Sequence, residues 1–513
     1  MLLRDVVEAS QKVGATRSRT AKVTALAAAL REAAPEEVET ATAYLSGVLR
    51  QRRTGLGWRS LTDLPQPAAE PTLTLTQVHE GFERIGSVSG TGSRAARTSA
   101  VHDLFARATA EEQAYLGRLA TGELRQGALD GLMLEAIAIA ADVPPAAVRR
   151  ASMLCGATVP VAVAALTEGA TGLSRFGLEV GRPVRPMLAS SAADLGEAFG
   201  KAGPAGQQLA VDRKLDGIRI QVHKYDGQVR VFTRTLDEIT DRVPEVVDAV
   251  SALPARSLVL DGEAIALDPD GRPRPFQETA ARTMTKLDVA TLRTTVPLTS
   301  YFFDLLHLDG QDLLDAPGHE RFAALAEALP DELVVPRLVT ADQQAASAYF
   351  TETLRSGHEG VVVKSLDATY EAGRRGAAWV KVKPRHTLDL VVLAVEWGSG
   401  RRQGWLSNIH LGARDADTGE LVMLGKTFKG MTDEMLRWQT ARFLELETSR
   451  SAHVVTVRPE QVVEVAFDGI QTSSRYPAGM ALRFARVLRY REDKSAAEAD
   501  TVDMVRALHT GTA

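Results

Sequence analysis

The stretch Asp212-Arg213-Lys214-Leu215-Asp216-Gly217-Ile218-Arg219 holds a lysine in a chain whose 60 basic residues are mostly arginines. An arginine stays protonated inside a protein, whereas a lysine amine can lose its proton. A neutral amine is a nucleophile, and burial or neighbouring cations can lower its pKa far enough. The alternative interpretation is that Lys214 is an ordinary surface lysine on a strand. Other motifs of the chain are needed to distinguish the two.

The residues around Lys214 indicate two strands joined by a tight turn. In a strand, alternation places Asp212 and Lys214 on the same face. Asp216-Gly217 is a hairpin-turn signal, and the returning strand would carry Arg219. We therefore expect the Lys214 amine to lie between a carboxylate and a guanidinium.

Length and composition limit the class of protein. A chain of 513 residues suggests about three domains. The net charge is −5, so affinity for a nucleic acid requires local basic surfaces. The single cysteine, Cys155, excludes internal disulfides and a cysteine-cluster zinc site. No apolar run reaches the roughly 18 residues of a membrane span and no signal-peptide pattern begins the chain, so we expect a cytoplasmic protein without a membrane segment.

The patterning predicts a multidomain protein with three regions. Residues 1–175 show apolar positions at helical spacing and predict an all-α domain, followed by a Gly- and Pro-rich linker over 169–186. Residues 176–384 alternate in strand fashion between short helices and predict an α/β domain with a mixed, antiparallel sheet. Residues 385–513 are strand-like with Gly turns, which suits an OB-fold β-barrel ending in a short helix or frayed tail.

Several further positions are suited to nucleotide chemistry. Glu263 and Glu359 could hold Mg²⁺ against phosphate oxygens, although hydrogen bonding to nearby backbone or Arg is equally consistent with either alone. Lys381 and Lys383 share a strand face. Two ammonium groups so close together repel each other unless an anion lies between them, which favours a bound polyphosphate. Phe303 lies in an apolar strand, where a core role is the simpler interpretation.

These elements occur in a characteristic order. The series is Lys214-Leu-Asp-Gly-Ile-Arg219, Thr233-Arg234, Asp261-Gly-Glu263, the aromatic-Asp pair at Phe303, Glu359-Gly-Val-Val-Val-Lys364, Trp379-Val-Lys381-Val-Lys383 and Arg491-Glu-Asp-Lys494. It resembles the nucleotidyltransferase motifs of ATP-dependent DNA ligases. The helical N-terminal region is similar to the DNA-binding domain of the larger ligases of that family.

The resemblance assigns roles to residues on the nucleotide. It implies that Lys214 attacks the α-phosphate of ATP and becomes Lys-AMP, that Phe303 stacks on adenine, and that Glu359 binds Mg²⁺. Glu263 would meet the ribose or the metal. Asp212 replaces the commoner Glu, which leaves a role in adenine or metal recognition open.

The cationic positions are assigned in the same way. Arg219 and Arg234 would contact the nucleotide or the DNA 5′-phosphate, and Arg375 the nucleotide, with neighbouring Arg374 as the alternative. Lys381 and Lys383 would neutralise the α-phosphate. Arg491 and Lys494 would orient the pyrophosphate when the barrel closes about a hinge near Pro384-Arg385, unless they form an ordinary charged turn.

The N-terminal region offers two candidate contacts with DNA phosphates. Gly86–Arg94 precedes a helix expected over 95–108, and its exposed amides with Arg94 and Arg97 suit a phosphate, a flexible loop without ligand being the alternative. Gly122–Gly127 resembles a backbone-contacting segment of the ligase domain. Such contacts position a duplex and carry little sequence information.

The resemblance implies an ATP- and Mg²⁺-dependent DNA ligase that seals 3′-hydroxyl/5′-phosphate nicks in duplex DNA during replication, repair and recombination. Three domains of a monomer would encircle the nick. An RNA ligase or an RNA-capping nucleotidyltransferase shares the Lys-x-Asp-Gly core, but capping enzymes lack a comparable helical domain. A catalytically silent DNA clamp is the alternative from another class.

Overall fold

The computed structural model describes residues 1–51, 54–90, 92–124, 130–284, 288–372, 375–384 and 386–510. The chain divides into two compact units, Met1–Lys381 and Val382–Ala513. None of the helices in the described part of the chain is long and apolar enough to cross a membrane.

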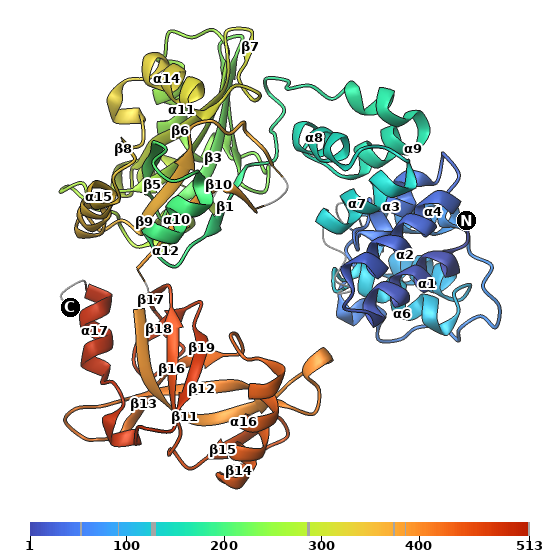
Figure 1. The fold of residues 1–513 in the computed structure, drawn as a ribbon. Coiled ribbons are helices and arrows are strands. Elements are labelled where there is room, and N and C mark those ends of the chain that lie inside the picture. Colours follow the sequence, from blue (N-terminus) through green and yellow to red (C-terminus); the bar gives the residue numbers. More distant parts are fainter. Residues whose placement is uncertain are drawn as a thin grey trace. The chain divides into compact units, whose positions relative to one another are not determined.

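The first part of unit one is helical (Figure 1, blue to cyan). Its α-helices are α1 (Leu3–Ala15), α2 (Arg19–Glu32), α3 (Val38–Leu45), α4 (Leu75–Ser87), α5 (Ser93–Phe105), α6 (Ala110–Ala120), α7 (Asp130–Ala140), α8 (Pro145–Cys155) and α9 (Val159–Ser174). A kink at Gly169, which has φ 62° and ψ −140°, interrupts α9, and the helix resumes as far as Ser174, so the expected linker begins only after Ser174.

Local sequence explains where these helices begin and which face they bury. Thr74 caps α4 by accepting a hydrogen bond from the Gln77 backbone amide, and the Thr74 backbone amide in turn donates to the Gln77 side-chain oxygen. Apolar residues at helical spacing, among them Val78, Phe82 and Ile85, are then fully buried in one core.

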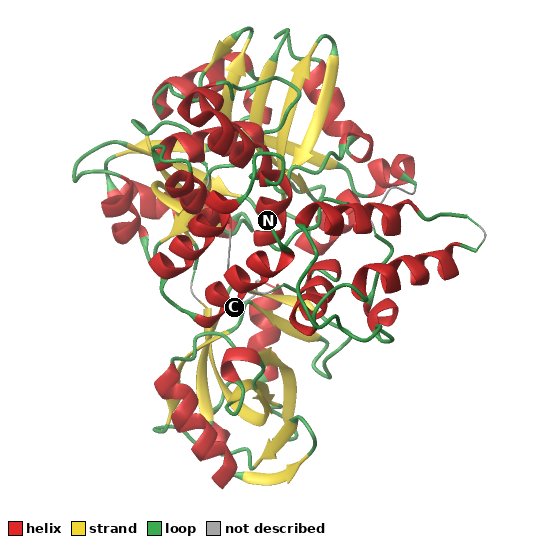
Figure 2. Ribbon diagram, turned by 90° about the vertical axis from the view of Figure 1, so that its right-hand side faces the viewer, coloured by secondary structure: helices red, strands yellow, loops and turns green. Residues whose placement is uncertain are grey.

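The second part of unit one contains two sheets with helices around them (Figures 1 and 2). The first sheet has the order β1-β10-β9-β2-β8 and the second β4-β3-β5-β6-β7. The strands are β1 (Leu188–Ser191), β2 (Leu209–Lys214), β3 (Ile218–Tyr225), β4 (Gln228–Thr233), β5 (Leu258–Ala266), β6 (Leu298–Leu308), β7 (Gln311–Asp312), β8 (Arg337–Thr340), β9 (Gly360–Ser365) and β10 (Arg375–Val382). The helices are α10 (Leu195–Ala202), α11 (Pro244–Ser251), α12 (Phe276–Met284), α13 (Val289–Thr295), α14 (Gly318–Ala328) and α15 (Gln343–Arg355).

The expected hairpin around Asp216-Gly217 is wrong. Strand β2 pairs with β8 and β9, whereas β3 pairs with β4 and β5, so the turn carries the chain from one sheet to the other. Gly217 is needed there because a Cβ would lie 2.4 Å from the Ala264 carbonyl oxygen and 3.0 Å from Glu263 Cγ. The close approach of two backbones, and not a tight reversal, explains this glycine.

Unit two is built on a seven-stranded sheet with the path β13-β12-β11-β15-β14, to which β16 and β19 are added through β11. Its strands are β11 (His386–Trp397), β12 (Leu406–Arg414), β13 (Leu421–Thr427), β14 (Glu447–Arg450), β15 (Val454–Val457), β16 (Val462–Phe467), β17 (Gly469–Thr472), β18 (Met480–Arg483) and β19 (Arg486–Arg491). Two helices accompany them, α16 (Asp433–Glu445) and α17 (Val502–Thr510). The expected C-terminal helix is confirmed; α16, whose Leu436 and Phe443 are fully buried in the core, was not expected.

Replacing Gly217 by Ala should destabilise unit one by about 1–3 kcal/mol, because the added methyl group forces β3 away from Ala264. Denaturant unfolding measures the loss. The matched control is Gly200→Ala in α10, where nothing lies within 4 Å of the added Cβ. That control should be neutral or stabilising by up to about 1 kcal/mol. Equal effects of the two substitutions would contradict the close approach.

Candidate active site

Lys214 is the last residue of β2 and lies three residues before Gly217, where the chain crosses to the second sheet. Its Nζ forms an ion pair with the Glu359 carboxylate, which is attached just before β9. The pairing is supported by the backbone, because the Glu359 amide donates to the Lys214 carbonyl at 3.1 Å. The Lys214 side chain is 21% exposed and that of Glu359 15%, so solvent or a ligand can still reach the pair.

The electrostatics of Lys214 differ from the sequence-based expectation. Burial lowers the pKa of the ammonium, but the negative charges of Glu359 and Glu263 and the hydrogen bond to Glu359 outweigh it and raise the pKa. In the nucleotide-free protein the nearby carboxylates therefore raise the pKa of Lys214, whereas burial or neighbouring cations were expected to lower it. In this state the nucleophile candidate is held as a cation.

Asp212 does not contact Lys214, contrary to the expected arrangement. Its buried carboxylate accepts from Arg337 at 2.5 and 2.8 Å and lies 2.7 Å from Lys364 Nζ. Burial raises the pKa of Asp212, but the charges of Arg337 and Lys364 outweigh it and lower that pKa. For Lys364, burial dominates over the attraction of Asp212 and lowers the pKa of the ammonium. Asp212 thus belongs to a buried ionic cluster with Arg337 and Lys364 and is not a partner of Lys214.

Arg219 is held by a different carboxylate. Asp261 accepts from Arg219 Nε at 2.9 Å and Nη2 at 2.6 Å, and its second partner is the Tyr370 hydroxyl at 2.7 Å. The Arg219 guanidinium lies 5.4 Å from the Phe303 ring centroid and 5.7 Å from that of Trp379. The bidentate pair fixes the planar guanidinium beside the aromatic rings.

Phe303 and Trp379 form an aromatic wall with ring centroids 5.8 Å apart in an edge-to-face arrangement. Lys364 Nζ lies 4.5 Å from the Phe303 centroid and 4.1 Å from that of Trp379. These cation–π contacts orient both rings. Trp379 is buried, whereas Phe303 remains half-buried and could offer its free surface to a flat ligand.

The carboxylates beside Lys214 fit a magnesium ion by their chemistry. Burial raises the pKa of Glu263, and the nearby charge of Glu359 adds to this, against the lowering effects of Lys214, the Gly217 amide and Arg219. No group of three or more His, Cys, Asp or Glu side chains capable of holding a metal occurs in the described ranges. A cation held by one or two carboxylates and completed by water and substrate phosphate is typical of Mg²⁺.

The remaining expected contacts of the adenylation region are placed as follows. Arg234 is exposed in the turn after β4, and Lys381 lies in β10 opposite Ser191 of β1. Arg375 begins β10, but its side chain, like Arg374 and Arg385, lies outside the described residues.

In the two N-terminal loops, Thr91 and residues 125–127 also lie outside the described residues. Helix α5, expected over 95–108, spans Ser93–Phe105.

In unit two, the expected pyrophosphate-orienting residues contact one aspartate. Asp389 Oδ2 accepts from Arg491 Nη1 at 2.9 Å and from Lys494 Nζ at 2.6 Å. Lys383 lies 3.9 Å from Asp468. These contacts belong to unit two alone.

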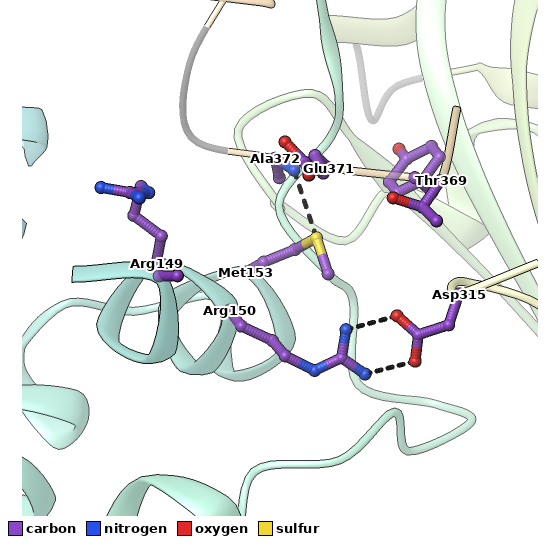
Figure 3. A pocket seen from close by; sticks show the side chains of 9 residues that line it. Arg149, Arg150, Met153, Asp315, Thr369, Glu371 and Ala372 are labelled. Atoms are coloured by element: carbon purple, nitrogen blue, oxygen red, sulfur yellow. Dashed lines mark hydrogen bonds and ion pairs between the residues drawn. The ribbon is translucent and has the colours of Figure 1, made fainter. Parts of the chain in front are cut away.

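A cavity of about 360 Å³ lies next to α8 in unit one (Figure 3). Arg150 donates to Asp315 at 2.6 and 2.7 Å, and the Met153 sulfur accepts from the Ala372 amide at 3.2 Å. Tyr370, whose hydroxyl contacts Asp261, also lines the cavity. The lining joins the helical region to the sheets, and it is not the Lys214 site.

The partners that hold the site residues in place were not predicted from the sequence. Arg337 pairs with Asp212 across 125 positions of sequence, and no local pattern indicates that contact. Lys364 offered a signal, because it is the one charged residue in the buried strand Gly360–Ser365. Asp261 precedes the expected Glu263 by two residues and occupies the fully buried middle of β5.

Comparisons with known proteins agree with the arrangement of these motifs. Residues 59–138, 186–383 and 402–494 match the family models DNA ligase N terminus, ATP dependent DNA ligase domain and ATP dependent DNA ligase C terminal region. A probable DNA ligase of a Nocardioides species is 65% identical over 512 residues, covering 99% of both chains. A probable DNA ligase of Beutenbergia cavernae is 62% identical over 514 residues, again covering 99% of each. The solved structure Pmar-Lig_PreS3 has a TM-score of 0.62 at 17% identity, covers 95% of this chain and 99% of its own, and indicates a shared fold.

The matches define the class of protein as a DNA ligase. More specifically, the chain belongs to the family of ATP-dependent DNA ligases and is an enzyme of that kind, which uses ATP and acts on DNA.

Removing the Glu359 charge should lower the pKa of Lys214, because burial then outweighs the remaining attraction. NMR titration of nucleotide-free protein with ¹³C-labelled lysine measures this. In the unmodified protein, Lys214 should titrate above the ordinary value of 10.5. In Glu359→Gln it should titrate lower, so that more amine is neutral at any given pH.

The matched control for that titration is Glu197→Gln, which removes the partner of surface Lys201 in the same unit. It should leave the pKa of Lys214 unchanged. A Lys214 that titrates alike in the unmodified protein and in Glu359→Gln would refute the ion pair as the cause of the raised pKa.

Proposed function

We propose that the enzyme seals nicks in duplex DNA through a covalent adenylate on Lys214. The observation that carries the proposal is the partly exposed Lys214 amine, which lies beside two carboxylates suited to Mg²⁺. An aromatic wall with a half-buried Phe303 lies on neighbouring strands and provides a surface for adenine stacking. The ordered motifs of the ATP-dependent DNA ligases support the same assignment.

The reaction proceeds in three steps. The neutral Lys214 amine attacks the α-phosphorus of ATP, a phosphorus–nitrogen bond forms, and the phosphorus–oxygen bond to pyrophosphate breaks; the one proton that the amine loses passes to solvent. The DNA 5′-phosphate oxygen then attacks the same phosphorus and frees Lys214. Finally the 3′-hydroxyl attacks the 5′-phosphate, loses its proton and expels AMP.

Lys214 must first leave its ion pair with Glu359. A cation bound by Glu359 and Glu263 would compete with the ammonium for these carboxylates, so that burial could then lower the pKa of the amine. Magnesium, when bound, supplies positive charge that polarises the phosphate oxygens. The ion pair thus keeps Lys214 in place and inactive until nucleotide and metal arrive.

The cationic residues would stabilise the charge that moves onto the phosphates. Arg219, held by Asp261, would contact the nucleotide or the DNA 5′-phosphate. We assign Arg234 to the same substrates and Arg375 to the nucleotide. Lys381 and Lys383 would neutralise the α-phosphate. Asp212 has a supporting role, because its carboxylate is occupied by Arg337 and Lys364.

The proposed domains are a helical DNA-binding domain over 1–175, an adenylation domain over 176–384 and an OB-fold domain over 385–513. The five-stranded path of unit two with β16 and β19 added through β11 supports the OB assignment. We propose that Arg491 and Lys494 orient the pyrophosphate when this domain closes, and that it then swings away to grip DNA. We further propose a cytoplasmic monomer that acts in replication, repair and recombination.

Incubation with α-labelled ATP, GTP or NAD and Mg²⁺ tests the proposed chemistry. Label should reach the protein from ATP alone and should be lost in Lys214→Ala. Lys201→Ala, which removes an exposed lysine of the same unit, is the matched control and should keep full labelling. Absence of transfer from every nucleotide would favour the silent clamp, and subsequent sealing of nicked RNA but not DNA would favour an RNA ligase.

Binding to nicked duplex should be salt-sensitive and tolerant of sequence, because phosphate contacts carry it. The slope of log affinity against log salt should become shallower by about 0.9 for each phosphate contact removed. Arg94, exposed at the start of α5, is a candidate contact, so Arg94→Ala should reduce the slope. Arg4→Ala, which removes an exposed arginine paired with Asp5 in α1, should not. An affinity independent of salt would rule out this mode of binding.

A further inference from the structure

Asp389 lies in β11 of unit two and is only 8% exposed. Its backbone is fixed from both sides: its amide donates to the Asp500 carboxylate at 2.8 Å, and its carbonyl accepts from the Asp500 amide at 2.9 Å. In the sheet it lies opposite Glu464 of β16. Asp389 is therefore a rigid, buried carboxylate at the base of the C-terminal unit.

Two cations converge on one oxygen of this carboxylate. Arg491 Nη1 lies 2.9 Å and Lys494 Nζ 2.6 Å from Asp389 Oδ2, while the buried Oδ1 has no hydrogen-bond partner in the described residues. Like charges this close repel each other strongly unless an anion is shared between them. The shared oxygen therefore determines where the two cationic groups lie.

Arg491 is oriented by a second carboxylate as well. Asp493 accepts from Arg491 Nε at 2.8 Å and from Nη2 at 2.7 Å, so that the remaining Nη1 turns toward Asp389. The charges of Arg491 and Lys494 are thus balanced by those of Asp389 and Asp493, and the Asp500 carboxylate, which accepts from the Asp389 amide, adds a further negative charge. Without a net positive charge, the cluster gains little long-range attraction for a polyphosphate, and its contribution is geometric.

We propose that Asp389 is a positioning residue for the first step of the ligase reaction. It holds Arg491 and Lys494 as a pair, with the spacing at which both can donate to one pyrophosphate group. This inference rests on the proposed function, in which Arg491 and Lys494 orient the pyrophosphate leaving group. Asp389 itself touches neither substrate nor the reacting atoms; Lys494 Nζ and Arg491 Nη1 keep further N–H groups that can donate to the pyrophosphate while Asp389 holds them.

Asp389→Asn should lower the maximal rate of Lys214-AMP formation without weakening the apparent affinity for ATP. The amide removes the shared charge, so the two cations repel each other and lose their fixed spacing. The maximal rate of Lys214-AMP formation should fall by about tenfold, as expected for loss of preorganised donors. The local charge becomes more positive, so the ATP concentration at half-maximal rate should stay the same or fall.

The experiment compares two half-reactions of the full-length enzyme. Single-turnover labelling with α-labelled ATP reports Lys214-AMP formation, and sealing of nicked duplex by pre-adenylated enzyme reports the later steps. Asp389→Asn should slow the first step and change the second by less than about twofold. Adding Lys494→Ala to Asp389→Asn should cause less further loss than Lys494→Ala alone, because the two residues act together. Glu447→Gln, which breaks an exposed carboxylate–Arg450 pair in the same unit, is the matched control and should leave both half-reactions unchanged.

The outcomes separate this inference from the proposed function. If Arg491→Ala and Lys494→Ala slow the first step selectively but Asp389→Asn does not, the positioning role is wrong and the proposed function stands. If Lys494→Ala slows both half-reactions alike, the pyrophosphate role itself is wrong. If Asp389→Asn lowers the melting temperature and loses both half-reactions together, Asp389 is structural and the inference is overturned.

Discussion

The partly exposed ion pair of Lys214 with Glu359 is the interaction on which the site depends. It joins the end of β2 to the start of β9, and the backbone hydrogen bond between the same two residues prevents either from drifting. The pair raises the pKa of an amine that chemistry requires to be neutral. In the proposed mechanism the Lys214 amine becomes reactive only after its surroundings change, and the carboxylates that restrain it are the groups proposed to hold a metal ion.

The division into two sheets gives the site its shape. Because the chain crosses from β2 to β3 at Gly217, Lys214 belongs to one sheet while Arg219 and Glu263 belong to the other. The Gly217 amide donates to Glu263 at 2.9 Å and ties the crossing to the second sheet. Groups from both sheets can then act on one ligand, which a simple hairpin would have placed on a single surface.

Much of this arrangement could be predicted from the sequence, and particular residues show why the rest could not. Alternation around Lys214 and apolar spacing such as that in α4 depend only on neighbouring residues. Strands and helices with these patterns could therefore be predicted from the sequence. The strand that pairs with β2 is decided by contacts over 120 residues away, and a turn signal at Asp216-Gly217 cannot distinguish a hairpin from a crossing. Burial is equally non-local, which is why the raised pKa of Lys214 and the ionic partners of Asp212 emerged only from the fold.

Mass spectrometry of protein exposed to ATP and Mg²⁺ tests the central claim most directly. Peptide mapping under conditions that preserve phosphoramidates should locate one added AMP on Lys214 Nζ, and treatment with nicked DNA should remove it. Adenylate on another residue, or an unmodified Lys214 in an enzyme that still seals nicks, would contradict the account.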